Sequence, residues 1–343
     1  MINNIQSTVV SSRVRLARNL ADLPFPNRLQ DVRKAKSIVK NVYEAASGIG
    51  LFHLYSMSEI SDTVAQSLCD DHLISPELAA NKICGAVVIA EEDGDLMPGG
   101  KFSVMINEED HLREQYIVKG LNLSYAYMQL SAVDDEFSKR LRFAYDPRFG
   151  YLTACPTNLG TGLRASVMLF LPGLTRKKKM TRLIREISRL GHTVRGVYGE
   201  GSRAEGYMYQ ISNEVTLGVD EEYILSEVQR AVLKIVNFEA HARKELCADG
   251  EAEVKDECCR AYGILCNCET ISYKEFLRLA SDVKLGVALG FIDTNDFAVI
   301  DEFIAKMRPS NLDVLRDIPF ETRERDLFRA LKCRQFFSKL RRK

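Results

Sequence analysis

Long hydrophobic runs are missing from this chain of 343 residues. The longest apolar stretches, residues 83–90 and 165–174, are much shorter than the roughly 18 to 20 residues that a helix needs to cross a bilayer. The first residues, Met1 to Ser7, show no basic segment followed by an apolar stretch, so no export signal is expected. These absences predict a cytoplasmic protein without a membrane segment.

An excess of charge of either sign is also missing, because 47 Lys and Arg residues balance 47 Asp and Glu residues. Direct binding of nucleic acid or membrane is therefore not expected, and any anion must be bound by a local cluster. The nine cysteines are an odd number, and a cytoplasmic setting keeps thiols reduced, so no disulfide framework is expected. No metal site is expected either, because Cys258, Cys259, Cys266 and Cys268 lack C-x-x-C spacing.

Three familiar signatures of nucleotide binding are broken or absent. Residues 94–102 resemble a P-loop, but the lysine is misplaced and no Ser or Thr follows it. Residues 199–204 match G-x-G-x-x-A, yet Glu200 stands where a pyrophosphate would have to approach. The H-R-D and D-F-G motifs of protein kinases are absent. A nucleotide would have to be held by other groups.

The composition, with 46% hydrophobic and 27% charged residues, is typical of a folded globular protein, and the length suits about two domains. Helical periodicity occurs at residues 30–46, 123–142, 178–190, 221–246, 272–290 and 296–307. Strands are predicted at residues 83–90, 101–107, 151–154, 165–171, 193–198 and 207–216, the first two forming a hairpin. The expected fold class is α/β (α+β), with a mostly antiparallel sheet flanked by helices in residues 1–222 and an all-helical domain in residues 223–343.

Arginines stand at predicted strand ends and in loops. The spacing of Arg13 and Arg15 puts both guanidinium groups on one face of an extended segment. A guanidinium is a planar fork of donors, so several converging forks could hold a triphosphate without a P-loop, although isolated solvated arginines are the alternative. The candidate phosphate ligands are Arg13, Arg15, Arg113, Arg164 and Arg195.

Three further segments carry reactive groups. Residues 107–113 contain three carboxylates and an arginine directly after a predicted strand, which is also what a solvated turn looks like. Cys155 lies between a strand and a loop rich in Pro and Gly, where a nearby cation could hold it as a thiolate, and a buried inert thiol is the alternative. Residues 195–202 form a glycine-rich loop with one Arg and Glu200, a type of loop that commonly closes over substrate.

In this order, the segments resemble motifs of the phosphagen kinase superfamily and, within it, the bacterial McsB-type protein arginine kinases. Residues 11–15 resemble the first nucleotide-binding motif, residues 107–113 the acidic box, residues 155–164 the cysteine loop and residues 195–200 the mobile loop. The resemblance covers nearly the whole chain. It implies a phosphagen-kinase-like fold for the predicted first domain.

The resemblance also implies roles for individual residues. The five arginines would clamp the phosphates of ATP bound with Mg²⁺. Glu109 and Glu200 would grip the guanidinium acceptor, one of them as the base, because a group with a pKa above about 12 must lose a proton before its nitrogen can attack. Cys155 would contact the same guanidinium as a thiolate.

The acceptor follows from a difference within the superfamily. Members that act on small guanidines carry a helical domain before the Ser-x-Arg-x-Arg motif, whereas that motif starts at residue 11 here, so an open site is expected. The implied activity is ATP-dependent phosphorylation of arginine side chains in proteins, marking them for Clp-type proteolysis and regulating stress-response repressors. An activator protein and a homodimer are also implied. The alternatives are a small-molecule guanidino kinase and a phosphoarginine-binding adaptor with impaired catalysis.

The C-terminal part resembles the same subgroup. Residues 324–330 match its R-D-x-x-R-A phosphoarginine-binding motif. Arg325 and Arg329 share a helix face and could fork a phosphate, while Asp326 accepts from the guanidinium of the same ligand; a basic, exposed helix end is the alternative. Arg182 is added to this allosteric pocket from the basic stretch 176–189.

Two positions depart from the family pattern. Arg203 stands where the subgroup usually has an acidic residue, which affects the expected loop closure or peptide preference. Met168 stands where many phosphagen kinases have a His near the adenine. The resemblance therefore defines the nucleobase that is preferred less sharply than it defines the arginines that bind the phosphates.

Overall fold

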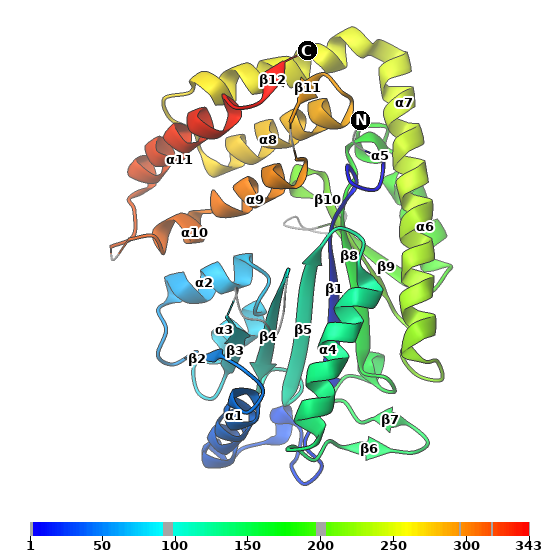
Figure 1. Ribbon diagram of the computed structural model, residues 1–343, viewed down its shortest axis with the longest axis vertical. Coiled ribbons are helices and arrows are strands. Elements are labelled where there is room, and N and C mark those ends of the chain that lie inside the picture. The colour runs from blue at the N-terminus through cyan, green and yellow to red at the C-terminus, as the bar shows by residue number, and fades with distance from the viewer. Residues whose placement is uncertain (1–2, 92–98, 197–203, 295, 317, 343) are drawn as a thin grey trace. The chain divides into compact units, whose positions relative to one another are not determined.

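The computed structural model describes residues 3–91, 99–196, 204–294, 296–316 and 318–342 (Figure 1). Its main sheet has the strand order β2-β3-β4-β5-β1-β8-β10-β9. These strands are β1 (Val9–Arg18), β2 (Phe52–Ser56), β3 (Ala86–Ala90), β4 (Gly100–Ile106), β5 (Leu112–Lys119), β8 (Leu163–Phe170), β9 (His192–Gly196) and β10 (Met208–Asn213). The neighbours from β2 through β1 pair antiparallel, so the predicted antiparallel sheet with flanking helices is confirmed.

Helices and short elements complete the chain. The α-helices are α1 (Val32–Ser47), α2 (Asp62–Asp70), α3 (Pro76–Ala80), α4 (Leu123–Ser138), α5 (Pro172–Arg176), α6 (Met180–Ser188), α7 (Glu221–Asn267), α8 (Tyr273–Ala288), α9 (Ala298–Lys306), α10 (Pro309–Asp313) and α11 (Thr322–Phe337). The short strands are β6 (Tyr145–Asp146), β7 (Gly150–Tyr151), β11 (Ile292–Asp293) and β12 (Arg341–Arg342), and the 3₁₀ turns are η1 (Pro26–Arg28), η2 (Pro156–Asn158) and η3 (Glu205–Tyr207). Among the described helices, none is both long and apolar enough to cross a membrane.

The chain divides into two compact units. The sheet unit comprises residues 11–167 and 212–230, and the helical unit comprises residues 1–10, 168–211 and 231–343. The predicted domain boundary between residues 222 and 223 lies beside the start of α7 at Glu221 and stays a prediction.

In the sheet unit, successive strand residues point to opposite faces and bury both of them. On one face α1 packs against β2, β3 and β4, and α4 packs against β5 (Figure 1). On the other face, Val87 and Met105 join Leu78 of α3 in a small core. Helix α1 begins where the side chain of Asp31 accepts from two backbone amides of the first turn.

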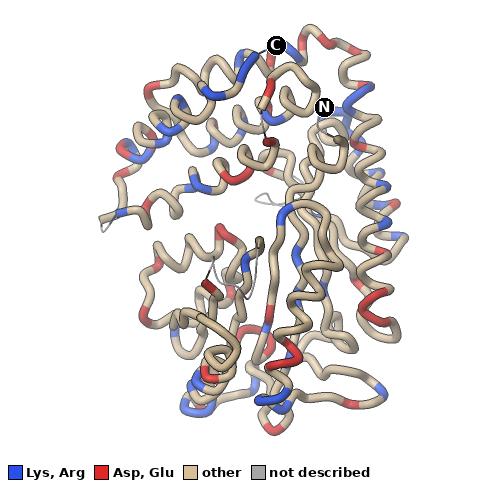
Figure 2. Tube along the Cα trace, in the orientation of Figure 1, with Lys and Arg blue, Asp and Glu red and all other residues tan. Residues whose placement is uncertain are grey.

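In the helical unit, α7, α8 and α11 share one apolar core. Phe276, Ala280 and Val283 of α8 recur at helical spacing and pack with residues of the neighbouring helices, such as Leu265 and Phe337. Charged residues of both signs occur along the length of these helices (Figure 2). Helix α11 begins with a capping box formed by Glu321 and Glu324.

Most predicted elements are present, and the differences have local causes. The helix predicted over residues 123–142 ends at Ser138, because Phe137 O accepts from both Arg140 N and Leu141 N and closes the last turn. The helix predicted to end at residue 246 continues to Asn267, with a non-helical Gly250 inside it. The strand predicted over residues 151–154 shrinks to β7, because Ala154 N donates to the carboxylate of Asp110. All nine cysteines are free thiols.

Candidate active site

The register of β1 and β5 brings arginines together. Arg15 lies opposite Gln115, and Ala17 lies opposite Arg113. Residues opposite one another share a sheet face, so Arg15 and Arg113 are diagonal neighbours on that face. Along β1, Arg13 and Arg15 are half-buried between fully buried residues of the other face, as their i, i+2 spacing predicts.

Five of the predicted site residues line a single cavity of about 220 Å³ in the sheet unit. Its lining comprises Arg15, Ala17, Glu109, Arg113, Cys155, Thr157, Asn158, Gly162 and Arg164. They come from β1, the acidic turn (residues 107–111), β5, the cysteine segment (residues 152–162) and β8. Segments far apart in sequence therefore place three guanidinium groups, a carboxylate and a thiol around one space.

The arginines of this cavity form a repelling cluster. Burial, together with the positive charges of Arg13, Arg113 and Arg164, lowers the pKa of Arg15 well below its usual value. The Nε atom of Arg15 is buried without a hydrogen-bond partner among the described residues. Arg164 donates from Nη2 to Ser212 Oγ at 3.1 Å. A polyanion would supply both the negative charge and the acceptors that such a cluster requires.

Arg13 stands apart from the others. It does not line the 220 Å³ cavity, and its Nε donates to Ser166 Oγ at 3.4 Å. Its charge still acts on Arg15.

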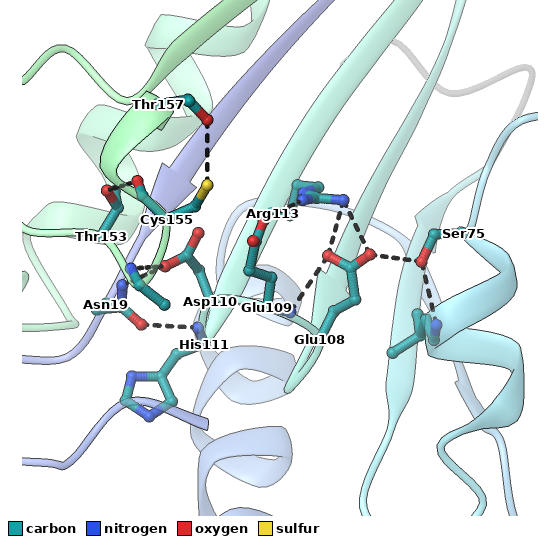
Figure 3. A network of polar contacts seen from close by, with 12 residues as sticks. Asn19, Ser75, Glu108, Glu109, Asp110, His111, Arg113, Thr153, Cys155 and Thr157 are labelled. Atoms are coloured by element: carbon teal, nitrogen blue, oxygen red, sulfur yellow. Dashed lines mark hydrogen bonds and ion pairs between the residues drawn. The ribbon is translucent and has the colours of Figure 1, made fainter. Parts of the chain in front are cut away.

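The acidic turn holds Arg113 between two carboxylates (Figure 3). Arg113 Nη1 lies 2.7 Å from Glu108 Oε2, and Arg113 Nη2 donates to Glu109 Oε2 at 3.0 Å. Glu108 is largely buried and also accepts from Ser75 Oγ at 2.5 Å, whereas Glu109 is the more exposed of the two. Sequence reasoning missed the role of Glu108 as the anchor of Arg113; its only signal was its place in the acidic run. The contact also shows that Glu109 can reach a guanidinium from this turn.

Cys155 lies in the cavity wall with its sulfur 3.1 Å from Thr157 Oγ1. Thr153 Oγ1 donates to Cys155 O at 2.8 Å, and Arg18 Nη1 donates to Thr161 O at 3.1 Å (Figure 3 shows Cys155 with Thr153 and Thr157). Arg18 is itself fixed by a buried ion pair with Asp134 at 2.8 Å. The first bond closes a turn within the cysteine segment, and the second ties the end of that segment at Thr161 to β1.

Glycines let neighbouring backbone approach this segment closely. Gly160 has a φ of +108°, and a Cβ there would lie 2.3 Å from Thr216 O. A Cβ on Gly150 would lie 2.4 Å from Gly160 O. Tyr151 N donates to Gly160 O at 2.7 Å, so this tight stack is also hydrogen-bonded. Only glycine fits either position.

Two further predicted site residues lie outside the sheet unit or outside the described residues. Arg195 is an exposed residue of β9 in the helical unit. Glu200, predicted as the second acceptor-binding carboxylate, and Arg203, the departure from the family pattern, lie outside the described residues.

The predicted phosphoarginine residues lie in the helical unit. Arg325 Nε is 3.3 Å from Asp313 Oδ1, and Arg325 remains partly exposed. Arg329 differs from the expected phosphate fork, because its guanidinium is 1% exposed and donates to Met307 O, Ile271 O and Asp326 Oδ1. Arg182 is an exposed residue of α6 that pairs with Glu186 at 3.0 Å.

Comparison with known proteins agrees with the antiparallel sheet flanked by helices, which is the fold of guanidino phosphotransferases. Residues 34–242, more than half of the chain, match the model of the ATP:guanido phosphotransferase C-terminal catalytic domain, and the chain belongs to this family. Residues 251–343 match the model of the protein-arginine kinase McsB C-terminal domain.

Individual relatives agree with these matches. The chain is 41% identical over 327 residues to the protein-arginine kinase of Symbiobacterium thermophilum, covering 94% of this chain and 91% of the relative. It is 37% identical over 335 residues to that of Caldanaerobacter subterraneus, covering 96% and 97%. Among solved structures, it is similar to the substrate-free duplicated taurocyamine kinase of Schistosoma mansoni, with a TM-score of 0.59 and 27% identity over 70% of this chain and 34% of that one. Lombricine kinase gives a TM-score of 0.57 and 25% identity over 68% and 67%.

Proposed function

We propose that this chain transfers the γ-phosphoryl group of ATP to arginine side chains of proteins. The observation that carries the proposal is the cavity in which Arg15, Arg113 and Arg164 face Glu109 and Cys155. The guanidinium groups of the arginines can bind the phosphates of the donor nucleotide. The carboxylate and the thiol can bind a guanidinium acceptor. Relatives named protein-arginine kinase and the match to the McsB C-terminal domain support a protein as the carrier of the acceptor.

The arginines bind and polarise the nucleotide. Phosphoryl transfer spreads negative charge over the oxygens of the transferred group, and preorganised guanidinium groups stabilise that charge. Of the five proposed ligands, Arg15, Arg113 and Arg164 line the cavity, and the other two are Arg13, whose charge acts on Arg15, and Arg195. We propose that Mg²⁺ enters bound to the phosphates of ATP and neutralises part of their charge.

The carboxylates orient and deprotonate the acceptor. A guanidinium nitrogen loses a proton to Glu109 or Glu200 and attacks the γ-phosphorus, so that an N–P bond forms while the bond to the β,γ-bridging oxygen breaks. ADP leaves with the electron pair of that bond. Cys155 provides a further contact that holds the guanidinium in line with the γ-phosphate.

Regulation and context extend the proposal. We propose that Arg325 and Asp326 recognise phosphoarginine, with Arg329 as the buried support that fixes Asp326 at 2.6 Å and with Arg182 as an outer contact. A catalytic domain at residues 1–222 and a helical, dimerising domain at residues 223–343 complete the arrangement. The same resemblance suggests a cytoplasmic enzyme with an activator protein, whose products are degraded by a Clp-type protease and include stress-response repressors.

The test is incubation of the full chain with Mg-ATP and an arginine-rich protein, followed by mass spectrometry under neutral conditions that preserve the acid-labile N–P bond. Wild type is expected to place phosphate on arginine, and Glu109→Ala and Glu200→Ala to lose it. Glu44→Ala, which removes an exposed carboxylate of α1, is the matched control and keeps full activity.

Each other outcome selects a different function. Phosphorylation of free arginine at a rate comparable to that of the protein substrate identifies a small-molecule guanidino kinase. Absence of phosphate together with specific binding of phosphoarginine identifies an adaptor. Sedimentation showing only particles of 38.7 kDa contradicts the proposed dimer.

A further inference from the structure

Three segments that carry candidate site residues meet at one buried amide, that of Asn19. Asn19 directly follows the last residue of β1 and is 1% exposed. Its Nδ2 donates to Asp110 Oδ1 at 2.6 Å and to Leu152 O at 3.0 Å, and its Oδ1 accepts from His111 N at 2.9 Å. The amide therefore joins β1 to the acidic turn and to the cysteine segment (Figure 3).

Asp110 is the second member of this connection. It is fully buried, and its Oδ1 also accepts from Ala154 N at 2.7 Å. Asp110 follows Glu109 in sequence, and Ala154 precedes Cys155. Through Oδ1 of Asp110, the residue that follows Glu109 is thus hydrogen-bonded to the residue that precedes Cys155.

The hydrogen bonds of Asn19 can hold the acidic turn and the cysteine segment at a fixed separation. Only a side-chain amide offers two donors and an acceptor in one plane, and Asn19 uses all three on partners from two segments. Hydrogen bonds in such buried surroundings are strong, and breaking one leaves a buried polar group unsatisfied. The acidic turn is fixed at its other end as well, where Asn107 Nδ2 donates to Ala35 O at 2.9 Å and to Cys84 O at 3.0 Å.

The carboxylate of Asp110 uses only one of its oxygens in this way. Oδ2 is buried and has no hydrogen-bond partner among the described residues. An asparagine at this position would keep both accepted hydrogen bonds through its carbonyl oxygen. Both hydrogen bonds that Asp110 accepts therefore need an acceptor at Oδ1, and neither needs a second oxygen at Oδ2.

We propose that Asn19 and Asp110 are positioning residues for the arginine acceptor, because together they set the separation of Glu109 and Cys155. The proposal rests on the proposed kinase function and deepens it. The connection lies on the acceptor side of the site, because the three arginines of the cavity project from the strands β1, β5 and β8, whereas the hydrogen bonds of Asn19 and Asp110 reach the acidic turn and the cysteine segment.

The test measures kcat and KM for the arginine-rich protein and, separately, KM for ATP in full-length variants. Asn19→Asp places two carboxylates against each other, and it is expected to lower kcat/KM for the protein by on the order of 10²-fold, the effect of misplacing a catalytic group by about 1 Å. KM for ATP is expected to stay near the wild-type value. If Asn19→Asp does not fold, Asn19→Ser, which removes one donor, replaces it with the same expected direction.

Asp110 provides an isosteric comparison. Asp110→Asn is expected to retain near wild-type activity, while Asp110→Ala is expected to lose as much as Asn19→Asp. The double variant Asn19→Asp, Asp110→Asn restores one donor and acceptor pair and is expected to recover part of the loss. A role confined to fold stability would not produce this recovery in kcat/KM.

Ser103→Ala is the matched control for the loss of buried hydrogen bonds. Ser103 is fully buried, donates to Leu73 O and accepts from Gln115 Nε2, both at 2.8 Å, and touches no predicted site residue through these bonds. This variant is expected to lose thermal stability and to keep kcat/KM.

Three results overturn the proposal. The first is equal inactivity of Asp110→Asn and Asp110→Ala, which would assign the charge of Asp110 a role. The second is wild-type kcat/KM in a folded Asn19→Asp variant. The third is a rise in KM for ATP that parallels the loss in kcat/KM for the protein. A wild-type chain that phosphorylates no arginine contradicts the proposed function instead, so the two failures are distinguishable.

Discussion

At the scale of single residues, the site depends on groups that are poorly satisfied by the protein alone. Arg15 is the clearest case, with a lowered pKa and a buried Nε that has no partner among the described residues. A cation held among like charges destabilises the folded protein and is stabilised by an incoming anion. The same electrostatic repulsion therefore lowers the free energy of unfolding and favours anion binding.

Arg15→Met is accordingly expected to raise the unfolding temperature of the nucleotide-free protein, because it removes a buried charge from a repelling cluster. The same variant is expected to lose the stabilisation that ATP gives to wild type, because a ligand stabilises the folded state only to the extent that it binds to that state. Thermal shift with and without Mg-ATP measures both effects. Arg28→Met, an exposed position, is the control, and an undiminished ATP shift in Arg15→Met would contradict the assignment.

Cys155 is expected to assist and not to be indispensable. Cys155→Ala removes one of several contacts to the guanidinium, and it should lower kcat about tenfold, equivalent to roughly 1.4 kcal/mol, while leaving measurable turnover. Steady-state assays with the protein substrate check this. Cys69→Ala, a half-buried thiol of α2, is the comparison. Unchanged kcat and KM in Cys155→Ala would remove Cys155 from the site.

At the scale of elements, the sequence predicted the helices and strands whose apolar residues recur with a clear helical or strand spacing. The spacing of apolar residues indicated α1 and α6, which bury one face, α8, whose second half is buried on every side, and β3, β4 and β8, which are largely buried on both faces. Strand β5 was not predicted, because its start carries Arg113, Glu114 and Gln115 and reads as a polar turn. Its register against β1, which makes Arg15 and Arg113 neighbours, depends on pairing across a hundred residues that no local pattern contains.

The same limit applies to the site. The residue types around the cavity followed from motifs, whereas Glu108 and Asn19 have roles that only the fold creates. Arg329 shows the converse. Helical spacing predicts the face that it shares with Arg325, but its guanidinium is buried against the backbone carbonyls of Met307, just after α9, and Ile271, just before α8.

Strand β5 also carries a buried acid whose titration is testable. Burial and the negative charge of Asp134 raise the pKa of Glu114 well above its usual value. The folded state then keeps a proton that the unfolded chain releases above about pH 4.3, so wild type loses stability as pH rises above that point. Glu114→Gln removes this loss.

Urea unfolding at pH 5 and pH 8 provides the measurement. Relative to wild type, Glu114→Gln is expected to gain free energy of unfolding between pH 5 and pH 8, and the exposed control Glu44→Gln is expected to show no such gain. An equal difference at both pH values would show that Glu114 is ionised in the fold.

At the scale of the whole molecule, each compact unit has its own core and its own buried polar connections. In the helical unit, Glu239 is fully buried and accepts from Gly173 N at 2.8 Å, Leu174 N at 2.9 Å and Arg243 Nε at 2.7 Å. Arg243 in turn donates to Ser7 Oγ at 2.9 Å and to Phe170 O at 3.3 Å. One ion pair thus connects α7, α5 and the first residues of the chain.

Arg243→Met is expected to destabilise this unit by about 3–5 kcal/mol, the usual result of leaving one partner of a buried pair uncompensated. Hydrogen exchange of α5 and α7 amides locates the loss, because the two units need not unfold together. Adding Glu239→Gln, which keeps an acceptor but no charge, is expected to recover part of it. Protection equal to that of wild type in Arg243→Met would show the pair to be dispensable.

The glycine stack behind Cys155 has a consequence for the history of the gene. A change of one base converts a glycine codon into an alanine codon, and at Gly150 or Gly160 the added methyl would meet a carbonyl oxygen at 2.4 or 2.3 Å. Neither clash involves a flexible side chain that can step aside, so both displace the backbone of the cysteine segment. A single-base change to alanine at either codon is therefore expected to disturb the wall of the cavity, although it adds only one methyl group.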